Sequence, residues 1–483
     1  MNDTSKPFFF QALDALKLGD RRGAALALER QLRGGNTAQK NLPSVSELAT
    51  HIGEIDLAIE AMHRAVVPGS VESLMAYWAV LATYGRSDEA VADIKRQSTA
   101  IRNHPAVLHF TATAATQFGR FDEAQELFRR ALAGSPSLPA SWLSLAMIKR
   151  FHPGDPDIGA MEQVEARSAS DPEARAMLCY ALGKAWEECG DVDRAFEFWS
   201  RGAGLQRQQG VFNTGQFGRA ADQIIQTFTA DGLAKLTPSS FSKRTSLFVT
   251  GLPRSGTTLT EQILRGHSSV ADGDEANLFA PALIPLLGIG MPQALTYQQR
   301  LRHDDPWGEI ARDYARFMQM RFRTRDVVVD KSLGQSLLTG LILHALPEAR
   351  IAWLRRSPDD VALSCFRTFF ATGQPWTRSL ADIADYMRTE DKLFAHWLAI
   401  FPDRILVVPY EELVREPGDW SERLQDHFGL GYEPGLESSS REGRAIGSAS
   451  VSQAREPISA SRIGQAAMFE RHLQPFRDRY YAN

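Results

Sequence analysis

A turn at residues 251–258 has the residue types and spacing of an anion-binding site. It reads Gly-Leu-Pro-Arg-Ser-Gly-Thr-Thr and joins an apolar segment of strand length to a segment with helical periodicity. In such a turn the successive backbone N–H groups and the helix N-terminus converge on one small volume. Arg254, Thr257 and Thr258 would add a positive charge and two hydroxyl donors. The sequence therefore predicts a site for a phosphate or a similar anion.

The turn is similar to the GxxxxGK[ST] loop of nucleoside-triphosphate hydrolases, with one decisive difference. Thr257 stands where that loop has the lysine that reaches the β- and γ-phosphates. A triphosphate would lack its main counter-charge here, which argues against a P-loop kinase. A ligand with one phosphate joined to one sulfate carries less charge, so Arg254 and the two threonine hydroxyls could bind it without magnesium. A tight turn without a ligand is the structural alternative.

A second candidate anion site follows another apolar segment. Residues 355–364 read Arg-Arg-Ser-Pro-Asp-Asp-Val-Ala-Leu-Ser. We expect Arg356 at a strand end and Ser364 two turns into the next helix. A guanidinium binds a phosphate through two parallel N–H donors, and a hydroxyl can complete the shell. Taken alone, the two residues would be an exposed arginine and a helix serine, so the prediction depends on their pairing with the glycine turn.

These motifs together resemble the sulfotransferase superfamily, and within it the tyrosylprotein sulfotransferases and their bacterial relatives fused to tetratricopeptide repeats. The resemblance extends from about Leu247 to the C-terminus. It implies transfer of a sulfuryl group from 3′-phosphoadenosine 5′-phosphosulfate (PAPS) to a hydroxyl acceptor, without a metal. It implies that Arg356 and Ser364 bind the 3′-phosphate and that Tyr410 lines the nucleotide site. The residues implied to bind the 5′-phosphosulfate are Arg254, Ser255, Gly256, Thr257, Thr258 and Leu259.

The resemblance also implies the catalytic residues. Glu275 corresponds to the proposed general base, Lys331 and Arg254 to cations that stabilise the transition state, and Ser450 to a serine near the sulfuryl group. Asp274, next to Glu275, is a rival base.

Two neighbouring residues have structural alternatives. Asp330 could pair with Lys331 in an ordinary salt bridge, and we interpret His267 as a structural residue at a helix end.

Three positions depart from the family pattern. Gln465 and Ala466 stand where family members usually have a basic residue and a tryptophan, so one cofactor contact is in doubt. Asn277 replaces an arginine of the animal enzymes, which puts tyrosine in a protein in doubt as the acceptor. A glycan hydroxyl, a lipid head group and a small metabolite are the other candidates. A non-catalytic scaffold with a degenerate nucleotide-binding domain is the alternative function.

The elements around these motifs indicate an α/β domain. The segments SLFVTG, VVVDKS, RIAWLRR and RILVVPYEEL each carry an apolar run of strand length, and they alternate with longer helical segments. This alternation predicts an open, mostly parallel sheet with helices on both faces. Ligands of such folds bind at the carboxyl ends of the strands, where each motif falls.

The first half of the chain predicts an all-α solenoid of tetratricopeptide type. A glycine followed five residues later by alanine recurs at spacings close to the ~34-residue tetratricopeptide period. Each glycine is expected to end the first helix of a pair in a left-handed conformation, and each alanine to let the second helix approach. The glycines are Gly19, Gly53, Gly85, Gly119 and Gly190, with a weaker copy at Gly154.

We therefore expect a tetratricopeptide domain at residues 1–210, a helical linker at 211–244 and a P-loop-like sulfotransferase domain at 245–483. Such solenoids present a concave face to a peptide or a protein, so the repeats are expected to recruit the acceptor. Self-association into a homo-oligomer, or capping of the second domain, is the alternative role.

The composition limits the binding partners and the cellular compartment that the sequence predicts. The formal net charge of −4 gives no indication of nucleic-acid binding. Three cysteines without CxxC spacing argue against disulfides and a zinc site and favour a reducing compartment. No run approaches the ~20 apolar residues that a membrane span requires. A cytoplasmic enzyme is the expectation.

Overall fold

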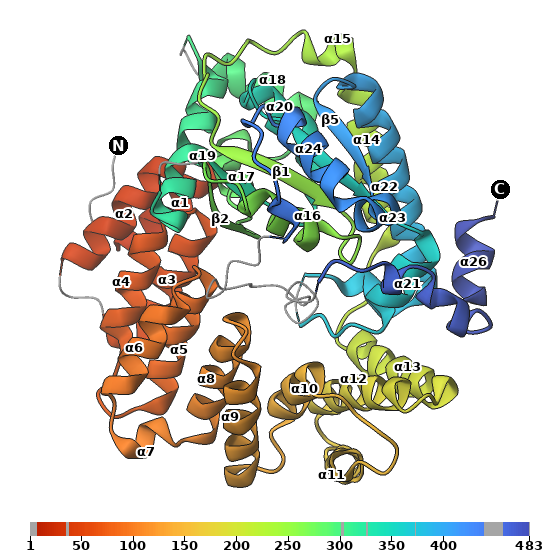
Figure 1. Cartoon of the computed structure of the whole chain (residues 1–483). Helices are drawn as coiled ribbons and strands as arrows, with labels where there is room; N and C mark the ends of the chain where they lie inside the picture. Colours follow the sequence, from red (N-terminus) through yellow and green to blue (C-terminus); the bar gives the residue numbers. More distant parts are fainter. Residues whose placement is uncertain are drawn as a thin grey trace.

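A helical N-terminal region precedes a domain built on a parallel sheet in the computed structural model of the chain (Figure 1). The structure describes residues 7–34, 38–300, 304–324, 327–371, 373–438 and 457–482.

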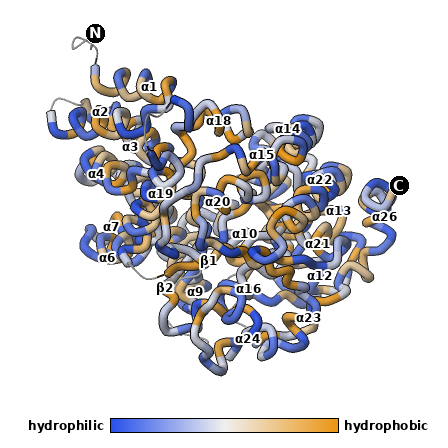
Figure 2. The backbone as a smooth tube through the Cα atoms, turned by 90° about the horizontal axis from the view of Figure 1, so that it is seen from above, coloured by the Kyte–Doolittle hydropathy of each residue, from blue (hydrophilic) through white to orange (hydrophobic). Residues whose placement is uncertain are grey.

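Paired helices make up the N-terminal region. They are α1 (Phe8–Lys17), α2 (Arg21–Arg33), α3 (Leu42–His51), α4 (Ile55–Ala65), α5 (Val71–Thr83), α6 (Ser87–Arg96), α7 (Thr99–Arg102), α8 (Pro105–Gln117), α9 (Phe121–Gly134), α10 (Pro139–Ile148), α11 (Pro156–Arg167), α12 (Pro172–Glu188) and α13 (Val192–Gln208). Two further helices, α14 (Thr214–Thr227) and α15 (Ala230–Leu233), lead to the sheet. In Figure 2 the N-terminal helices alternate between hydrophilic and hydrophobic along each turn, as expected for helices with one buried face.

The recurring glycines and alanines have the conformations that the sequence predicts. All six glycines have a positive φ between 66° and 84°, and each lies after the first helix of its pair. The alanine five residues later is fully buried in each of the five stronger copies. A β-carbon would strain the turn, and a larger side chain would separate the helices. These alanines are Ala24, Ala58, Ala90, Ala124 and Ala195.

Within the described residues, five parallel strands form the sheet, in the order β2-β3-β1-β4-β5. They are β1 (Ser246–Gly251), β2 (Val270–Asp274), β3 (Val327–Asp330), β4 (Ile351–Arg355) and β5 (Ile405–Pro409). The four strands predicted from apolar runs are confirmed. The fifth, β2, was not predicted, because VADGD has only two apolar residues at its start and forms by pairing with β3. All the carboxyl ends lie at one edge of the sheet.

Helices cover both faces of the sheet, as predicted. Successive residues of β1 point to opposite faces, so Leu247 and Val249 pack with α16 and α24, while Phe248 packs with α19 and α20. The helices of this domain are α16 (Thr257–Arg265), α17 (Phe279–Ala282), α18 (Met291–Arg300), α19 (Pro306–Phe322), α20 (Thr339–Ala345), α21 (Pro358–Phe366), α22 (Leu380–Ile400), α23 (Tyr410–Arg415), α24 (Pro417–His427) and α26 (Gln474–Tyr480). The short 3₁₀ helices are η1 (Gln39–Asn41), η2 (Ile284–Leu286), η3 (Gln335–Leu338), η4 (Pro375–Arg378), η5 (Leu436–Ser438), η6 (Ala460–Arg462) and η7 (Gln465–Phe469).

The helical region shares buried cores with the sheet domain at both of its ends. Near the N-terminus, the Arg21 side chain is 2% exposed and donates to Glu54 at 2.7 Å and to Asp313 of α19 at 2.8 Å. Near the other end, the fully buried Trp199 of α13 packs in one cluster with Leu363 of α21. Residues before 210 therefore complete the core around the sheet domain.

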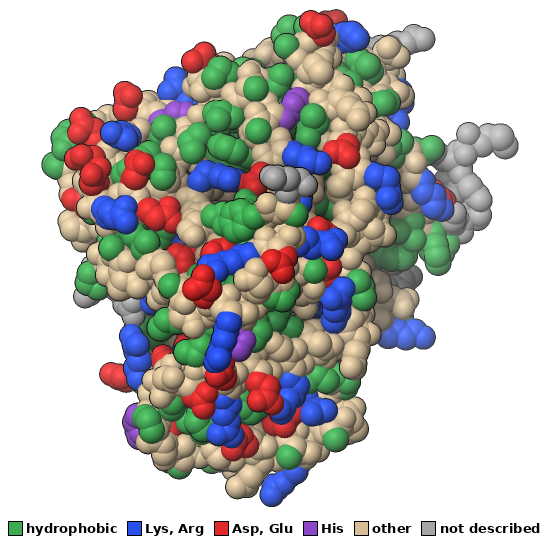
Figure 3. Space-filling model, turned by 90° about the vertical axis from the view of Figure 1, so that its right-hand side faces the viewer, with side chains coloured by type: hydrophobic (Ala, Val, Ile, Leu, Met, Phe, Trp, Pro, Cys, Tyr) green, Lys and Arg blue, Asp and Glu red, His purple; other side chains and the backbone are tan. Residues whose placement is uncertain are grey.

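Charged side chains are interspersed on the face that Figure 3 shows, with basic and acidic groups close to one another. In the described part of the chain, no helix is both long and apolar enough to cross a bilayer.

Candidate active site

The turn after β1 has a backbone that only a few residue types adopt. Gly256, directly before α16, has a φ of 107°, and a β-carbon there would lie 2.6 Å from Cδ2 of Tyr410. Arg254 also has a positive φ, 70°, which is uncommon for a residue with a side chain. The turn thus brings the backbone close to Tyr410 and holds Arg254 in a strained conformation, a feature that clusters at ligand sites.

A pocket lies over this turn and the start of α16. Seven of the predicted nucleotide-binding residues line it, together with one end of the described C-terminal segment. The predicted residues are Arg254, Gly256, Thr257, Thr258, Leu259, Arg356 and Tyr410. The other lining residues are Val414, Pro457, Ile458, Ser459, Ser461 and Arg462. Three arginines and a helix N-terminus give this pocket the charge and the donors that favour an anion.

Arg356 lies at the end of β4 and holds two walls of the pocket together. Its side chain is 9% exposed, and it donates to the carbonyls of Arg254 at 3.0 Å and Arg462 at 2.6 Å. The guanidinium lies over the Tyr410 ring, 4.3 Å from its centroid. Its buried Nε has no hydrogen-bond acceptor among the described residues. A ligand oxygen would satisfy this donor.

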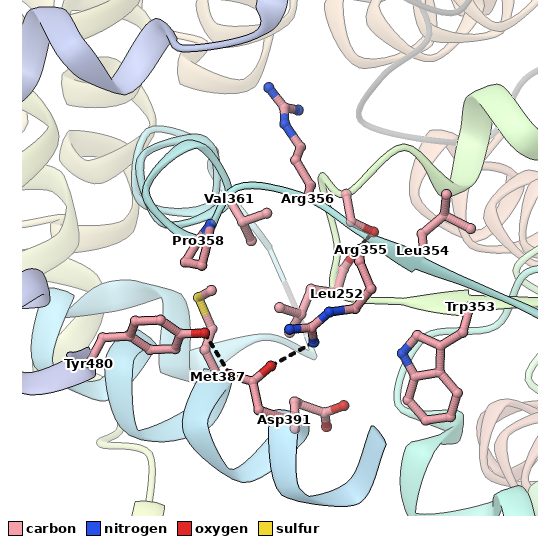
Figure 4. Close-up of a pocket in the computed structure, with 12 residues that line it drawn as sticks. Leu252, Trp353, Leu354, Arg355, Arg356, Pro358, Val361, Met387, Asp391 and Tyr480 are labelled. Atoms are coloured by element: carbon pink, nitrogen blue, oxygen red, sulfur yellow. Dashed lines mark hydrogen bonds and ion pairs between the residues drawn. The ribbon is translucent and has the colours of Figure 1, made fainter. Parts of the chain in front are cut away.

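The neighbouring Arg355 points elsewhere, as Figure 4 shows. Its guanidinium donates to Asp391 at 2.6 Å, and the Tyr480 hydroxyl donates to the same carboxylate at 2.5 Å. These residues line a second, narrow cavity, which Arg356 also borders. Of the two adjacent arginines, only Arg356 lines the pocket over the turn.

Two predicted residues, Ser255 and Ser364, lie behind the pocket. The Ser255 hydroxyl donates to the carbonyl of Leu252 at 2.6 Å and so closes the turn. The buried Ser364 accepts a hydrogen bond of 3.0 Å from Nε of Arg254. Ser364 therefore orients Arg254 in this structure. That Ser364 and Arg356 together contact the 3′-phosphate stays a prediction.

Arg254 lies in a strongly positive environment. Burial lowers the pKa of its guanidinium to about 10, and Arg367, Arg356 and Arg462 contribute further in the same direction. An anion that binds beside such a cation stabilises its charged form and raises its pKa again. This arrangement favours a negatively charged ligand at the turn.

The residues that fix the C-terminal wall of the pocket were not predicted. The Asp360 carboxylate accepts hydrogen bonds from the backbone N–H groups of Gly464 at 2.7 Å and Ala466 at 2.9 Å. Arg367 donates to Gln465 at 2.7 Å and also pairs with Glu187 of α12. Both unusual residues, Gln465 and Ala466, thus help to anchor the wall. The position of Asp360, one helical turn after Arg356, is the sequence signal that could have identified it.

A buried ion cluster lies at the carboxyl ends of β2 and β3. Lys331, 1% exposed, places its Nζ 2.8 Å from Oε1 of Glu275, whose side chain is 32% exposed. Asp330 does not supply the alternative salt bridge, because its carboxylate accepts hydrogen bonds from Tyr314, Ser332 and Gln335. The predicted base and the predicted cation are therefore in direct contact.

The turn that carries Glu275 is fixed by hydrogen bonds. Asn277 has a φ of 49°, its backbone N–H donates to Ser332 at 2.7 Å, and its side chain donates to the carbonyl of Glu275 at 3.3 Å. Buried His267 bonds to the carbonyl of Gly431 at 2.7 Å, which agrees with its structural interpretation. Ser450 and the side chain of Asp274 lie outside the described residues.

Comparison with known proteins identifies the class of this domain. Residues 246–434, which contain all five strands and the glycine turn, match the sequence profile of the sulfotransferase family. This part of the chain is therefore similar to the sulfotransferase family, and a helical region precedes it.

Individual proteins resemble this chain only at low sequence identity. A protein of Aquifex aeolicus (strain VF5), described as uncharacterized, is 27% identical over 387 residues, which are 77% of this chain and 50% of the relative. The chain thus spans half the length of that relative. The sulfotransferase domain of the Synechococcus PCC 7002 olefin synthase is 19% identical, with a TM-score of 0.35, over 48% of this chain and 90% of that domain. Sulfotransferase STF1 from Mycobacterium tuberculosis H37Rv is 13% identical, with a TM-score of 0.30, over 67% of this chain and 98% of that protein.

Proposed function

We propose that this protein is a sulfotransferase that takes its sulfuryl group from PAPS and passes it to a hydroxyl acceptor. The observation that carries the proposal is the pocket over the glycine turn, where Arg254 and Arg356 line one anion site within the sulfotransferase-family domain. Nε of Arg356, which has no acceptor among the described residues, the lowered pKa of Arg254 and the helix N-terminus all fit a ligand with more than one anionic group.

Each wall of the pocket has a part in holding the donor. The backbone of the turn, Arg254, Thr257 and Thr258 would bind the 5′-phosphosulfate, which needs less positive charge than a triphosphate. Arg356 would bind the 3′-phosphate and so distinguish PAPS from ordinary adenine nucleotides. Tyr410, stacked on Arg356 at 4.3 Å, would fix the guanidinium plane.

Glu275 is partly exposed, as a general base that contacts the acceptor must be, whereas Lys331 is buried, as suits a cation that stabilises charge. Glu275 is accessible, so it can accept the proton of an acceptor hydroxyl. The acceptor O–H bond breaks, the oxygen forms a bond to sulfur, and the sulfur–oxygen bond to the donor phosphate breaks with its electron pair remaining on the phosphate. Lys331 is held at the strand end in a dry site, where a positive charge stabilises developing negative charge most strongly.

The helical region would serve as a tetratricopeptide solenoid that recruits a protein or peptide acceptor, with a tyrosine hydroxyl as one candidate. A groove between α4, α5 and α6 supports this role. It combines the tilted ring pair His63 and Tyr77, 5.2 Å apart, with the charged residues Asp93 and Arg96. Replacing Tyr77 by alanine should raise KM for a protein acceptor and leave donor affinity unchanged. An unchanged KM would contradict recruitment through this groove.

Incubation with labelled PAPS and a desalted cell extract tests the proposed function. The proposal predicts transfer of label to an acceptor in the extract, and loss of transfer in the Arg254→Ala variant. No transfer by the wild type, together with no binding of adenosine 3′,5′-bisphosphate, would support the scaffold alternative. Identification of the labelled molecule would decide between a protein, a glycan, a lipid and a small metabolite.

A further inference from the structure

A second carboxylate lies beside Lys331 inside the protein. Glu261 of α16 is 3% exposed, and its Oε2 lies 3.9 Å from Nζ of Lys331. The same Nζ lies 2.8 Å from Oε1 of Glu275. One buried ammonium is therefore shared by two carboxylates that differ in access: Glu275 can meet an acceptor, whereas Glu261 is enclosed.

The position of Glu261 connects this ion cluster with the nucleotide pocket. Thr257, Glu261 and Arg265 follow one another at four-residue spacing, so they lie on one face of α16. Thr257 lines the pocket at the first turn of the helix. Arg265, 4% exposed, places Nη1 3.7 Å from Oε1 of Glu261. One helix face thus runs from the pocket to Lys331 and on to a second buried cation.

Lys331 needs a negative counter-charge throughout the reaction, and Glu261 can supply it. A buried ammonium without a counter-charge is strongly unfavourable. When Glu275 accepts a proton from the acceptor, its carboxylate becomes neutral and Lys331 loses its nearest counter-charge. The two cations beside Glu261, Lys331 and Arg265, favour its ionised form, and its enclosure keeps it from the acceptor's proton, so it can supply the counter-charge at that moment.

We propose that Glu261 is a positioning residue that keeps Lys331 charged and in place while Glu275 carries the acceptor's proton. This inference rests on the proposed function and deepens it. The proton from the acceptor O–H bond resides on Glu275, the bond to sulfur is made as the bond to the donor phosphate breaks, and Glu261 stays ionised throughout. Lys331 then interacts with the charge that develops on the transferred group.

The Glu261→Gln variant tests the inference through three separate readouts. With labelled PAPS and the cell extract, we expect the maximal rate to fall about 10- to 100-fold. Affinity for adenosine 3′,5′-bisphosphate should change less than about threefold, because Glu261 does not line the pocket.

The pH profile is the third readout. In the described part of the chain, the acidic groups near Lys331 include Glu275, Glu261 and its sequence neighbour Asp330, which Ser332 and its other donors already engage. Removing the Glu261 charge favours the neutral amine, so the alkaline limb of the rate profile should move to lower pH. The E261D variant keeps the charge and should recover most of the rate.

Two further variants separate positioning from folding. Glu165→Gln removes another buried carboxylate, paired with Arg175 at 2.8 Å in the helical region, and should leave the pH profile unchanged. If Glu261→Gln does not fold, Glu261→Gln with Arg265→Gln removes both charges of the pair and takes its place.

The outcomes of these tests distinguish the inference from the proposed function. A wild-type rate and pH profile in the Glu261 variants would overturn the inference while the proposed function stands. The inference would also be wrong if the rate fell with no shift of the alkaline limb and no recovery in E261D. A wild type that neither binds adenosine 3′,5′-bisphosphate nor transfers label would overturn both.

Discussion

Replacing Arg356 by alanine should weaken the binding of adenosine 3′,5′-bisphosphate by roughly 10- to 100-fold. Of the five N–H donors of a guanidinium, two are used by the carbonyls of Arg254 and Arg462. The buried Nε has no acceptor among the described residues and is available to a phosphate. Each charge-assisted contact contributes about 1.5–3 kcal/mol, which corresponds to the expected loss.

Calorimetric titration with two nucleotides tests this assignment. The wild type should bind adenosine 3′,5′-bisphosphate more tightly than adenosine 5′-phosphate, and the Arg356→Ala variant should lose that preference. Arg355→Ala is the matched control, because this adjacent arginine pairs with Asp391 outside the pocket (Figure 4) and should change affinity less than about threefold. Equal effects of the two variants, or an equal loss for both nucleotides, would refute a 3′-phosphate contact at Arg356.

Three further predictions follow from the site and its surroundings. Glu275→Gln should lower kcat about 10²- to 10⁴-fold and leave the nucleotide affinity near the wild-type value. The control Asp274→Asn should have a much smaller effect on kcat. Similar kinetics of the two variants would contradict the assignment of Glu275 as the general base. Activity should persist in the presence of a chelator, and inhibition reversed by magnesium would favour a kinase. Burial raises the pKa of Glu390 to about 7 from 4.5, so the folded state retains a proton that the unfolded chain has lost between these values. The free energy of unfolding should therefore fall by up to about 3 kcal/mol as pH rises through this window, and urea unfolding of Glu390→Gln should lack this part of the decrease; the same pH dependence in both proteins would contradict it.

Sequence patterns were sufficient to predict four strands of the sheet but not β2. Apolar runs identified β1, β3, β4 and the second edge strand, β5. The edge strand β2 lacked this signal, because Asp272, Gly273 and Asp274 follow its two apolar residues. Its backbone pairing with β3 decides the conformation, and this pairing is a tertiary contact. Glu275 directly follows β2, at the point where the chain leaves the strand.

The nucleotide pocket was largely predictable because its residues are close in sequence. The turn and the first residues of α16 form one continuous segment, and Arg356 and Tyr410 each follow a strand. The C-terminal wall was not predictable in the same way. Arg462 reaches the pocket through the hydrogen bonds between Asp360 and the chain at Gly464, which join segments about a hundred residues apart.

The repeat pattern predicted contacts within helix pairs but not the surfaces that those pairs cover. Glycine and alanine spacing specify how one helix approaches its neighbour. The outward contacts of Arg21 with Asp313, and of Trp199 with the core around α21, depend on side chains outside the repeated positions. The shared cores between the helical region and the sheet domain therefore came only from the structure.

Binding of PAPS in the pocket over the glycine turn can be measured by one pair of titrations. The purified protein of 483 residues is titrated with adenosine 3′,5′-bisphosphate and, separately, with ATP in the presence of magnesium. We expect saturable one-to-one binding of the bisphosphate without metal, weak or absent binding of ATP, and loss of bisphosphate binding when Arg254 and Arg356 are both replaced by alanine. Magnesium-dependent binding of ATP that exceeds binding of the bisphosphate, or bisphosphate binding that survives the double replacement, would contradict it.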